Sequence, residues 1–529
     1  MRFSKSFFLV LITLFLAIYY LVCGIYLNKL GYSNTEALFY VEKARIVFDG
    51  VGNRIKVMGL TSPIFPFYAT FIFFITAGSL TWSAVLAPII ASAVGTAVLF
   101  NIMASNLVKR FNDDFYLLIL LILFIFHPGI LFMACSGKGI YLVLLFFFLF
   151  FLNILKFYKS NTTFHISIAS ICLVILVFCD YKFIWLTLFF IPLVLSIAIQ
   201  SLNLSEKESI FRLFLSFNSP SLRRKLISKT FALYIIVFIL PIASVIGYKL
   251  LNLTHANDLN YFLESPYATW NVLSEKMNFD MMASSRGNSI IPEEISLLIS
   301  AKALLFCPMM ILAIYLFRRS TYQILTLLTP FGLIEFLHIK YDKVYLAYEY
   351  YLIFLVLALL CIIFRVQAIR RQKTVKLLLI IMVPVQIFTG YLFLAKSFLP
   401  EERNFITTLL TRKATDTNNQ GSAKDVAYYL NGIPQTSKIL VDDAIAYPII
   451  ANVNNVKQLT MPYQDEFSGA IEAPQKYDDY ILIATAKNIV TGYTQLNDKY
   501  IATIKLENSS LNLRIVYESD DWILYHIER

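Results

Sequence analysis

The ionisable residue in the most informative position of this chain is Glu36, in the polar interval between the first two apolar segments, residues 28–62. A carboxylate can accept a proton from a hydroxyl group during catalysis. It is also a favourable charge in the first turn of a helix, where Asn34 or Thr35 is the expected cap. Glu36 is therefore either a reactive carboxylate or a stabilising charge on a capped helix.

Other polar side chains lie in short segments that separate apolar runs. Lysine and arginine side chains bind anionic groups such as phosphates, although lysines beside apolar runs also extend toward lipid headgroups. His338 ends an apolar run and fits an interface position, whereas Asp180 has no evident structural role in a turn of three residues. The set of candidate binding residues is Arg45, Lys138, Asp180, Lys182, His338, Lys340 and Lys343.

The segment 35–48 is predicted to be an amphipathic helix that lies in the membrane surface. Its apolar residues recur at helical spacing, with Glu36 and Lys43 on the other side. Glu42, Arg45 and Asp49 are spaced three and four residues apart, which predicts a ladder of ion pairs on the helix surface.

The composition indicates a membrane protein. Of 529 residues, 58% are hydrophobic and only 15% are charged, whereas soluble domains carry about 25% charged residues. The net charge is +11, yet the part from Glu401 onward has 12 Lys and Arg against 17 Asp and Glu, a net charge of −5. The basic residues before it cluster in loops between apolar runs, a pattern typical of cytoplasmic loops and not of nucleic-acid binding.

Hydropathy predicts a polytopic α-helical protein with about eleven transmembrane helices. A twelfth apolar run, 63–79, is short and contains Pro63 and Pro66; if it crossed the bilayer, the later basic loops would face outward. The positive-inside rule therefore favours an interfacial or re-entrant helix there, and it places Glu36, Lys138 and the chain after residue 397 on the outer side. The predicted spans are 7–27, 83–104, 115–133, 139–155, 164–179, 183–199, 229–249, 299–317, 322–338, 344–364 and 377–397.

The chain is predicted to have two domains, a transmembrane domain at 1–400 and a soluble α/β domain at 401–529. The second has helical patterns around 424–430 and 443–451, and Asp442-Asp443 is expected to be a strand-to-helix cap. The six cysteines show neither a disulfide framework nor a metal-ligand spacing. Strands are expected at 438–441, 480–483, 500–506, 513–517 and 522–526.

Several motifs resemble the GT-C fold of integral-membrane glycosyltransferases. The similarity is greatest to the bacterial branch with arabinofuranosyltransferase-like and Legionella lipopolysaccharide-associated proteins. The similarity is loose over 1–400, and the motif match is specific only in the first loop and at Ser136-Gly137. The matching segments are Thr35-Glu36-Ala37, Lys43-Ala44-Arg45, Asp49-Gly50-Val51-Gly52, Gly59-Leu60-Thr61-Ser62-Pro63, Ala134-Cys135-Ser136-Gly137-Lys138, Asp180-Tyr181-Lys182 and Tyr348-Glu349-Tyr350-Tyr351-Leu352.

The sequence departs from the family pattern at several acidic positions. Thr35 stands where the family has the first of two Asp residues, so Glu36 alone represents the acidic pair. Lys138-Gly139 replaces a Met-Glu, and Asp180-Tyr181-Lys182 replaces an Arg-Pro-Glu-like turn. Either the donor site differs from that of the family, or the chain has kept the fold and lost the activity.

The resemblance implies transfer of a sugar from a polyprenyl-phosphate donor to a glycan, lipid or protein acceptor of the cell envelope. In this scheme Glu36 is the general base, and the candidate lysine and arginine side chains on the outer side of the membrane bind the leaving phosphate. With one carboxylate, no cofactor is expected and a tightly bound divalent metal is not favoured. The implied location is the bacterial inner membrane, with the C-terminal domain periplasmic and with membrane lipids, not nucleic acid, as the other partners.

Two alternatives remain open at this point. A lipid-linked glycan polymerase or ligase uses the same kind of donor and differs in the unit transferred. A flippase or transporter of lipid-linked sugars would carry charges in the middle of its spans, whereas the ionisable residues here gather at the outer ends. The loop 250–298, with Tyr261, Phe262, Tyr267 and Trp270, is consistent with sugar stacking or with an interfacial position.

Overall fold

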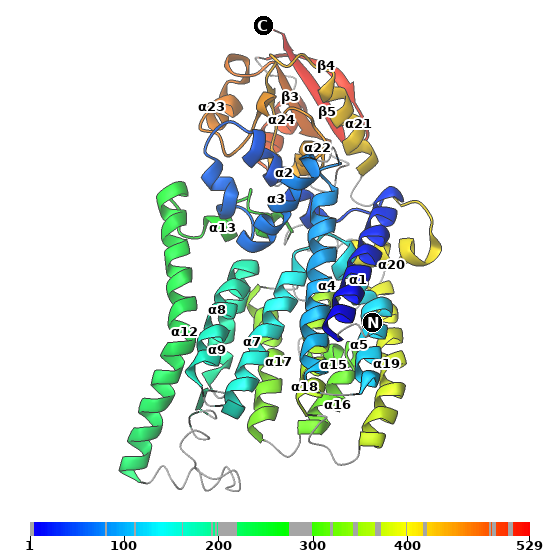
Figure 1. Ribbon diagram of the computed structural model, residues 1–529. Helices are drawn as coiled ribbons and strands as arrows, with labels where there is room; N and C mark the ends of the chain where they lie inside the picture. Colours follow the sequence, from blue (N-terminus) through cyan, green and yellow to red (C-terminus); the bar gives the residue numbers. More distant parts are fainter. Residues whose placement is uncertain are drawn as a thin grey trace.

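The protein consists of a tall helical bundle with a smaller mixed domain at one end (Figure 1). The computed structural model describes residues 5–528 except 80–81, 111–112, 161, 192–193, 196–197, 199–218, 274–298, 318–320, 342–346, 366–371, 398, 416–419, 486–487, 489–493 and 506–510.

Among the described residues, five helices are long and apolar enough to cross a membrane: α1 (Lys5–Lys29), α4 (Leu86–Val108), α7 (Ile140–Ser160), α12 (Pro220–Ala256) and α19 (Gln372–Ala395). The number rises to seven if each of two bent helix pairs is one span, namely α5 (Asp114–Phe126) with α6 (Pro128–Cys135) and α15 (Ile299–Phe306) with α16 (Met309–Phe317). Other apolar helices are α3 (Ile64–Ser79), α8 (Thr163–Cys179), α9 (Leu186–Phe189), α17 (Thr321–Tyr341) and α18 (Leu352–Arg365). The predicted count of about eleven spans stays a prediction.

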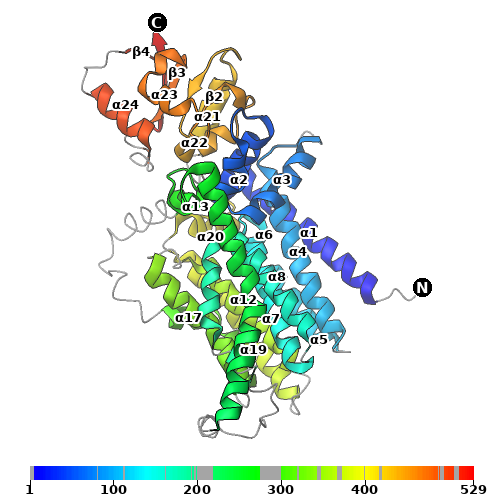
Figure 2. The same cartoon turned by 90° about the vertical axis from the view of Figure 1, so that its left-hand side faces the viewer.

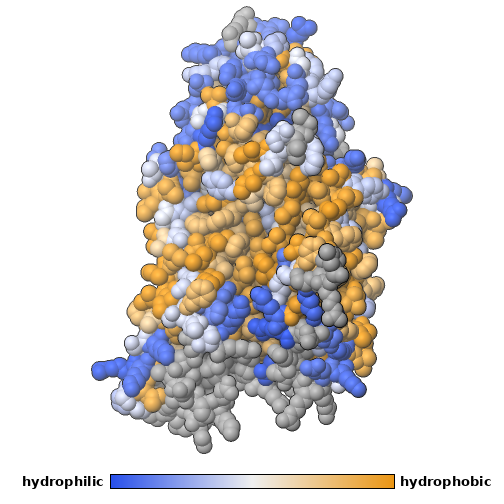
Figure 3. Space-filling view, viewed as in Figure 1, coloured by the Kyte–Doolittle hydropathy of each residue, from blue (hydrophilic) through white to orange (hydrophobic). Residues whose placement is uncertain are grey.

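The surface of the bundle carries a broad apolar band. Figure 3 shows this band between the hydrophilic C-terminal part and a lower end with many hydrophilic residues. Many large apolar side chains are exposed there, for example Phe15 at 61% and Phe388 at 67%. In water such a surface is unfavourable, so the protein is a multi-pass membrane protein.

The first polar interval folds into α2 (Thr35–Asp49) and a short π-helical turn (Lys56–Leu60), followed by α3. Asn34 caps α2, as predicted, because its side-chain oxygen accepts hydrogen bonds from the N–H groups of Glu36 and Ala37. Figures 1 and 2 place α3 beside α2, next to the C-terminal part. The interfacial interpretation of residues 63–79 stays a prediction.

The C-terminal part contains a five-stranded mixed sheet in the order β2-β1-β3-β5-β4. Strands β1 (Ile439–Leu440), β2 (Leu459–Thr460) and β3 (Tyr480–Ala484) are parallel, and β4 (Asn512–Glu518) and β5 (Trp522–Glu528) add antiparallel pairs. The helices are α20 (Pro400–Thr411), α21 (Gln420–Asn431), α22 (Asp443–Ile450), α23 (Phe467–Glu472) and α24 (Gln495–Lys505). The predicted α/β character is confirmed.

One predicted strand, 500–506, is wrong because its described residues belong to α24. Leu496 and Tyr500 lie one helical turn apart and are both buried, and the Tyr500 hydroxyl donates to the carbonyl of Ile471 at 2.7 Å. The run 500–506 is predominantly apolar in the manner of a strand, but the buried residues Leu496 and Tyr500 have helical spacing.

Helix α2 is enclosed between the bundle and the C-terminal part and does not lie on an open surface. Its apolar residues Tyr40, Ala44 and Val47 share one core with residues of α21 and α22. On its other side, Phe39 stacks on Tyr447 with ring centroids 4.0 Å apart. Figure 2 shows α2 directly beneath the sheet domain.

A buried charge cluster crosses this interface. Lys43 Nζ lies 2.6 Å from Asp443 Oδ2 and 3.2 Å from Glu42 Oε1, and all three residues are almost fully buried. Burial alone lowers the pKa of Lys43, but the two carboxylates outweigh it and raise that pKa. The predicted surface ladder is therefore wrong for Glu42, which the C-terminal part covers. The predicted cap is confirmed, since Asp442 Oδ1 accepts from the Ala444 N–H at 3.1 Å.

Candidate active site

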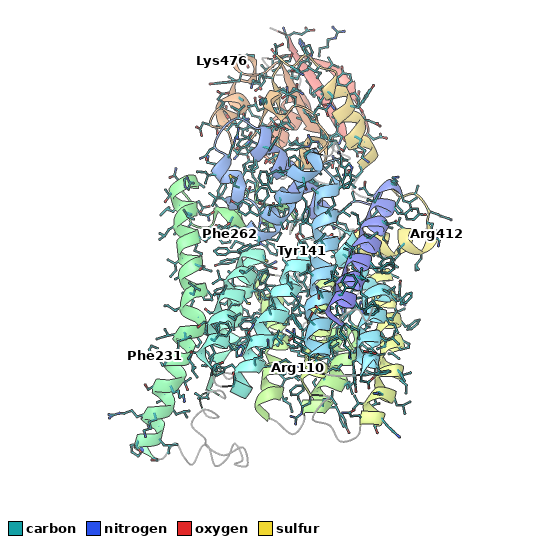
Figure 4. All side chains as sticks on the ribbon, viewed as in Figure 1. Arg110, Tyr141, Phe231, Phe262, Arg412 and Lys476 are labelled. Atoms are coloured by element: carbon teal, nitrogen blue, oxygen red, sulfur yellow. The ribbon has the colours of Figure 1, made fainter. Side chains whose placement is uncertain are left out.

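A cavity with about 940 Å³ of empty space, counting its open mouth, lies where the first loop meets the upper ends of α7, α8 and α12. Its polar wall comes from the start of α2, residues 61–64 and the turns 138–140 and 180–182. Val143, Val177 and Val245 belong to an apolar wall on the bundle side. Figure 4 shows Phe262, another lining residue, near the top of α12 and far from Arg110 at the opposite end of the bundle.

The carboxylate of Glu36 is held at the edge of this cavity. Its Oε1 atom accepts hydrogen bonds from the Tyr40 hydroxyl at 2.5 Å and from the Gly139 N–H at 3.1 Å. Its Oε2 atom lies 3.9 Å from Lys138 Nζ. Two donors thus fix one oxygen, and the other oxygen faces a lysine that lines the same cavity.

The glycines of the turn after α6 allow this approach. Gly137 has a φ of +79°, which glycine adopts without strain, and a Cβ there would lie 3.0 Å from the Cβ of Ala37. A Cβ at Gly139 would lie 2.7 Å from the Pro66 side chain. The turn therefore packs against both α2 and α3, which brings the Gly139 N–H to Glu36.

Asp180 and Lys182 form a second polar group in the cavity. Asp180 caps the short 3₁₀ helix Tyr181–Trp185 by accepting from the Lys182 N–H at 3.1 Å, and its Oδ2 lies 3.3 Å from Lys182 Nζ. Burial raises the pKa of Asp180, although Lys182 opposes that rise. Asp180 therefore has a structural role, as a helix cap and in an ion pair, which the sequence of its three-residue turn did not indicate.

The ammonium of Lys182 lies over the ring of Trp270, 3.0 Å from the ring centroid. Such a cation–π contact holds the cation in place without neutralising its charge. Trp270 lines the cavity together with Phe262 and Leu273, so part of the predicted aromatic loop does reach the site. The rest of that loop, 274–298, lies outside the described residues.

Three buried hydroxyl groups also line the cavity. Thr61, Ser62 and Thr269 are each at most 5% exposed, and their side-chain oxygens have no hydrogen-bond partner among the described residues. The Thr269 N–H donates to the Thr61 carbonyl at 2.7 Å, which joins the two segments. Buried hydroxyls without partners are unfavourable unless a ligand or water satisfies them.

The structure brings four of the predicted site residues together in this cavity, Glu36, Lys138, Asp180 and Lys182. Arg45 is not among the lining residues. It lies nine residues beyond Glu36, so a helix places it about 13 Å away on the opposite face. Its Nη1 atom instead donates to the carbonyl of Val453 in the C-terminal part at 2.7 Å.

His338 and Lys340 do not line the cavity either. The predicted turn at 338–343 starts later than expected, because α17 continues through Tyr341 and contains both residues. His338 is buried, and Lys340 Nζ lies 4.3 Å from the centroid of the Trp185 ring. Lys343 falls outside the described residues.

Glu401 is a residue that the sequence reasoning missed. Its carboxylate binds Thr35 and Asn34 at the start of α2, although it comes from the first turn of α20. The one local signal for it is Pro400, directly before it, since proline is common at the first position of a helix. Within the described part of the chain no group of three or more His, Cys, Asp or Glu could hold a metal ion.

No protein-family model and no curated protein matches the sequence. Two crystal structures of ArnT from Cupriavidus metallidurans are similar in fold, one bound to undecaprenyl phosphate and one in the apo state. The TM-scores are 0.52 and 0.51 at 11% sequence identity, and each match covers 99% of this chain and 98% of that chain. The chain has the GT-C fold. The resemblance that the first-loop motifs indicated is thereby confirmed for the fold, over nearly the whole length of the chain.

Proposed function

We propose that this GT-C protein is a glycosyltransferase that moves a sugar from a polyprenyl-phosphate donor to a cell-envelope acceptor on the outer side of the membrane. The observation that carries the proposal is the cavity itself, which holds Glu36, Lys138 and Lys182 beside an apolar wall. A lipid phosphate needs both a cationic and an apolar environment. The similar ArnT structure contains undecaprenyl phosphate, which supports this class of donor.

Glu36 is the proposed general base. In the reaction a hydroxyl oxygen of the acceptor bonds to the anomeric carbon, its proton passes to Glu36, and the bond from that carbon to the phosphate oxygen breaks. The bonding electrons leave with the polyprenyl phosphate. Tyr40 and Gly139 hold Oε1, so Oε2 is the oxygen that we assign to the proton transfer.

Lys138 and Lys182 are the proposed phosphate ligands. Positive charge fixed beside the leaving phosphate stabilises the negative charge that develops on it. Asp180 and Trp270 hold Lys182 in the cavity wall, which orients the ammonium before the donor binds. The hydroxyls of Thr61, Ser62 and Thr269 supply further donors and acceptors for the sugar or its phosphate.

The proposed location is the bacterial inner membrane with the cavity and the C-terminal part on the periplasmic side. Arg110, which belongs to one of the basic loops, lies toward the other end of the bundle from Phe262 (Figure 4), and the positive-inside rule assigns such loops to the cytoplasm. The proposed partners are the polyprenyl-phosphate sugar, a glycan, lipid or protein acceptor, and the surrounding lipids.

The test uses the full chain in lipid nanodiscs with a panel of synthetic undecaprenyl-phosphate-linked pentoses and hexoses. Envelopes from a strain lacking the gene serve as acceptor, and released undecaprenyl phosphate is measured by mass spectrometry. We expect release by the wild type and a loss on the order of 10²- to 10⁴-fold for Glu36→Gln. Glu466→Gln, an exposed glutamate in the C-terminal part, is the matched control.

The outcomes separate the alternatives. Near wild-type release by Glu36→Gln removes Glu36 from the mechanism. No release by the wild type from any donor overturns the transferase proposal and supports a GT-C protein without this activity. Repeated addition of units to the acceptor identifies the polymerase alternative. The flippase alternative is tested in parallel with the protein in sealed proteoliposomes, where transport of the intact donor to the inner leaflet would identify it.

A further inference from the structure

The carboxylate of Glu401 binds the N-terminus of α2. Oε1 accepts from the backbone N–H of Thr35 at 3.0 Å and also from the Thr35 hydroxyl, and Oε2 accepts from Asn34 Nδ2 at 2.7 Å. Both oxygens are thus used within the first turn of the helix that carries Glu36. Free N–H groups at a helix start favour such an anionic acceptor.

Asn34 connects this carboxylate to the backbone of Glu36. Its Oδ1 atom accepts from the Glu36 N–H at 3.0 Å and from the Ala37 N–H at 3.3 Å. Because the side-chain amide is planar, a bond that fixes Nδ2 also fixes the direction of Oδ1. Two consecutive hydrogen bonds therefore join Glu401 to the main chain at Glu36.

Glu401 is itself firmly placed by its helix. Phe405, one turn further along α20, packs edge-on against Tyr32 and Phe132, with ring centroids 5.4 and 5.1 Å apart. Phe405 and the next residue, Ile406, are buried in the core of the bundle. The carboxylate is consequently attached to the bundle and does not depend on α2 for its position.

The later turns of α2 are held by other contacts. Lys43 pairs with Asp443, and Phe39 stacks on Tyr447. These contacts leave the first turn, with Glu36, to be fixed by the network of Glu401 and Asn34 and by the Tyr40 and Gly139 donors.

We infer that Glu401 is a positioning residue for Glu36, which it holds against the cavity through Asn34. The inference rests on the proposed function for its catalytic meaning, but its structural content can be tested without any sugar donor. A base must be held within a fraction of an ångström of its productive position, and a misplacement of 1 Å can lower a rate by about a hundredfold.

The first experiment measures hydrogen exchange by mass spectrometry on the full chain in nanodiscs. For Glu401→Ala we expect exchange of the amides at 35–38 to rise on the order of tenfold, with little change at 43–47. Glu401→Gln keeps an oxygen acceptor and should raise exchange less. Glu466→Ala, at an exposed position of the C-terminal part, should leave both segments as in the wild type. Unchanged exchange at 35–38 in Glu401→Ala overturns the inference whatever the reaction is.

The second experiment measures kcat and KM for undecaprenyl phosphate release with the donor that the wild type uses. A positioning residue predicts that Glu401→Ala lowers kcat on the order of tenfold to a hundredfold while KM changes less than threefold, and that Glu401→Gln recovers part of kcat. An equal fall in the amount of folded protein and in activity, with unchanged kcat per folded molecule, contradicts the inference. If the wild type releases no undecaprenyl phosphate, the proposed function is contradicted. The hydrogen-exchange data then test the positioning role of Glu401 without any activity measurement.

Discussion

Lys43 and Asp443 lie 400 positions apart in the sequence, and their side chains form a buried ion pair with Nζ and Oδ2 2.6 Å apart. This pair joins α2, the helix that carries Glu36, to the first helix after β1 in the C-terminal part. The contact therefore couples the wall of the cavity to a segment that the sequence presents as a separate domain.

Replacement of Asp443 alone should destabilise the protein strongly. Asp443→Asn leaves the Lys43 ammonium buried beside Glu42 only, and loss of one partner of a buried pair typically lowers the free energy of unfolding by about 3–5 kcal/mol. Thermal unfolding in nanodiscs measures the effect, with the exposed Asp425→Asn as control. The triple replacement Glu42→Leu, Lys43→Met and Asp443→Leu should recover most of the loss, because it removes all three buried charges and leaves none without a partner. A thermal midpoint for Asp443→Asn equal to that of the control contradicts this account.

The neighbouring Asp442 predicts a pH dependence of stability. Burial, followed by the nearby Asp443 charge, raises the pKa of Asp442 to about 8. Since the folded protein then binds this proton more tightly than the unfolded chain does, the contribution is complete below about pH 4, where the unfolded carboxyl titrates, and is lost as the pH rises to about 8. The slope across this window approaches about 1.4 kcal/mol per pH unit. In Asp442→Asn, whose amide oxygen can still cap α22, this part of the slope should disappear; an unchanged slope would place the titration elsewhere.

Lys182→Met should weaken binding of undecaprenyl phosphate, because it removes the cation that Trp270 and Asp180 hold in the cavity wall. A charge-assisted bond to phosphate contributes about 1.5–3 kcal/mol, so we expect the dissociation constant to rise on the order of tenfold to a hundredfold. Lys340→Met is the matched control, since Lys340 lies on the Trp185 ring and does not line the cavity. The assay is titration of the full chain in nanodiscs with the lipid. Equal effects of the two variants would exclude a specific role for Lys182.

Thr269→Val should affect stability and binding in opposite directions. The hydroxyl is fully buried and has no partner among the described residues, so its removal should leave the thermal midpoint of the ligand-free protein unchanged or raise it. If the hydroxyl bonds to the sugar donor, the variant should bind that donor on the order of tenfold more weakly, a loss of about 1.4 kcal/mol. A lower midpoint together with unchanged donor binding would show that the hydroxyl serves the fold.

The parts of the site that the sequence predicted are those encoded by local patterns. The cap at Asn34 follows from residue types and short spacings, and the turn at Ser136-Gly137 follows from the resemblance to the GT-C family. The grouping of Glu36 with Asp180 and Lys182 follows from the positive-inside rule. That rule puts the first loop and the turns that contain Lys138 and Asp180 on the same side of the membrane. A local pattern cannot specify which of several outward lysines enters the cavity; Lys340, which points to Trp185, shows this.

The predictions that failed concern contacts between distant segments. Glu42 and Lys43 have the spacing of surface residues. Their burial becomes favourable only through the tertiary ion pair between Lys43 and Asp443. The role of Glu401 is likewise invisible locally, because its partners, Asn34 and Thr35, lie more than 360 residues earlier. The strand predicted at 500–506 is wrong for a local reason, because a short apolar run around Tyr500 fits a strand as well as a helix.

The shared core of α2 and the C-terminal part also bears on the order of assembly. Helix α2 belongs to the first tenth of the chain to be synthesised, whereas the residues that cover it come after position 420. Until then Tyr40, Ala44 and Lys43 lack the partners that bury them. The helix that carries Glu36 is thus fully packed only when the last segment of the chain folds onto the first loop, so a product truncated before residue 420 would expose this face of α2.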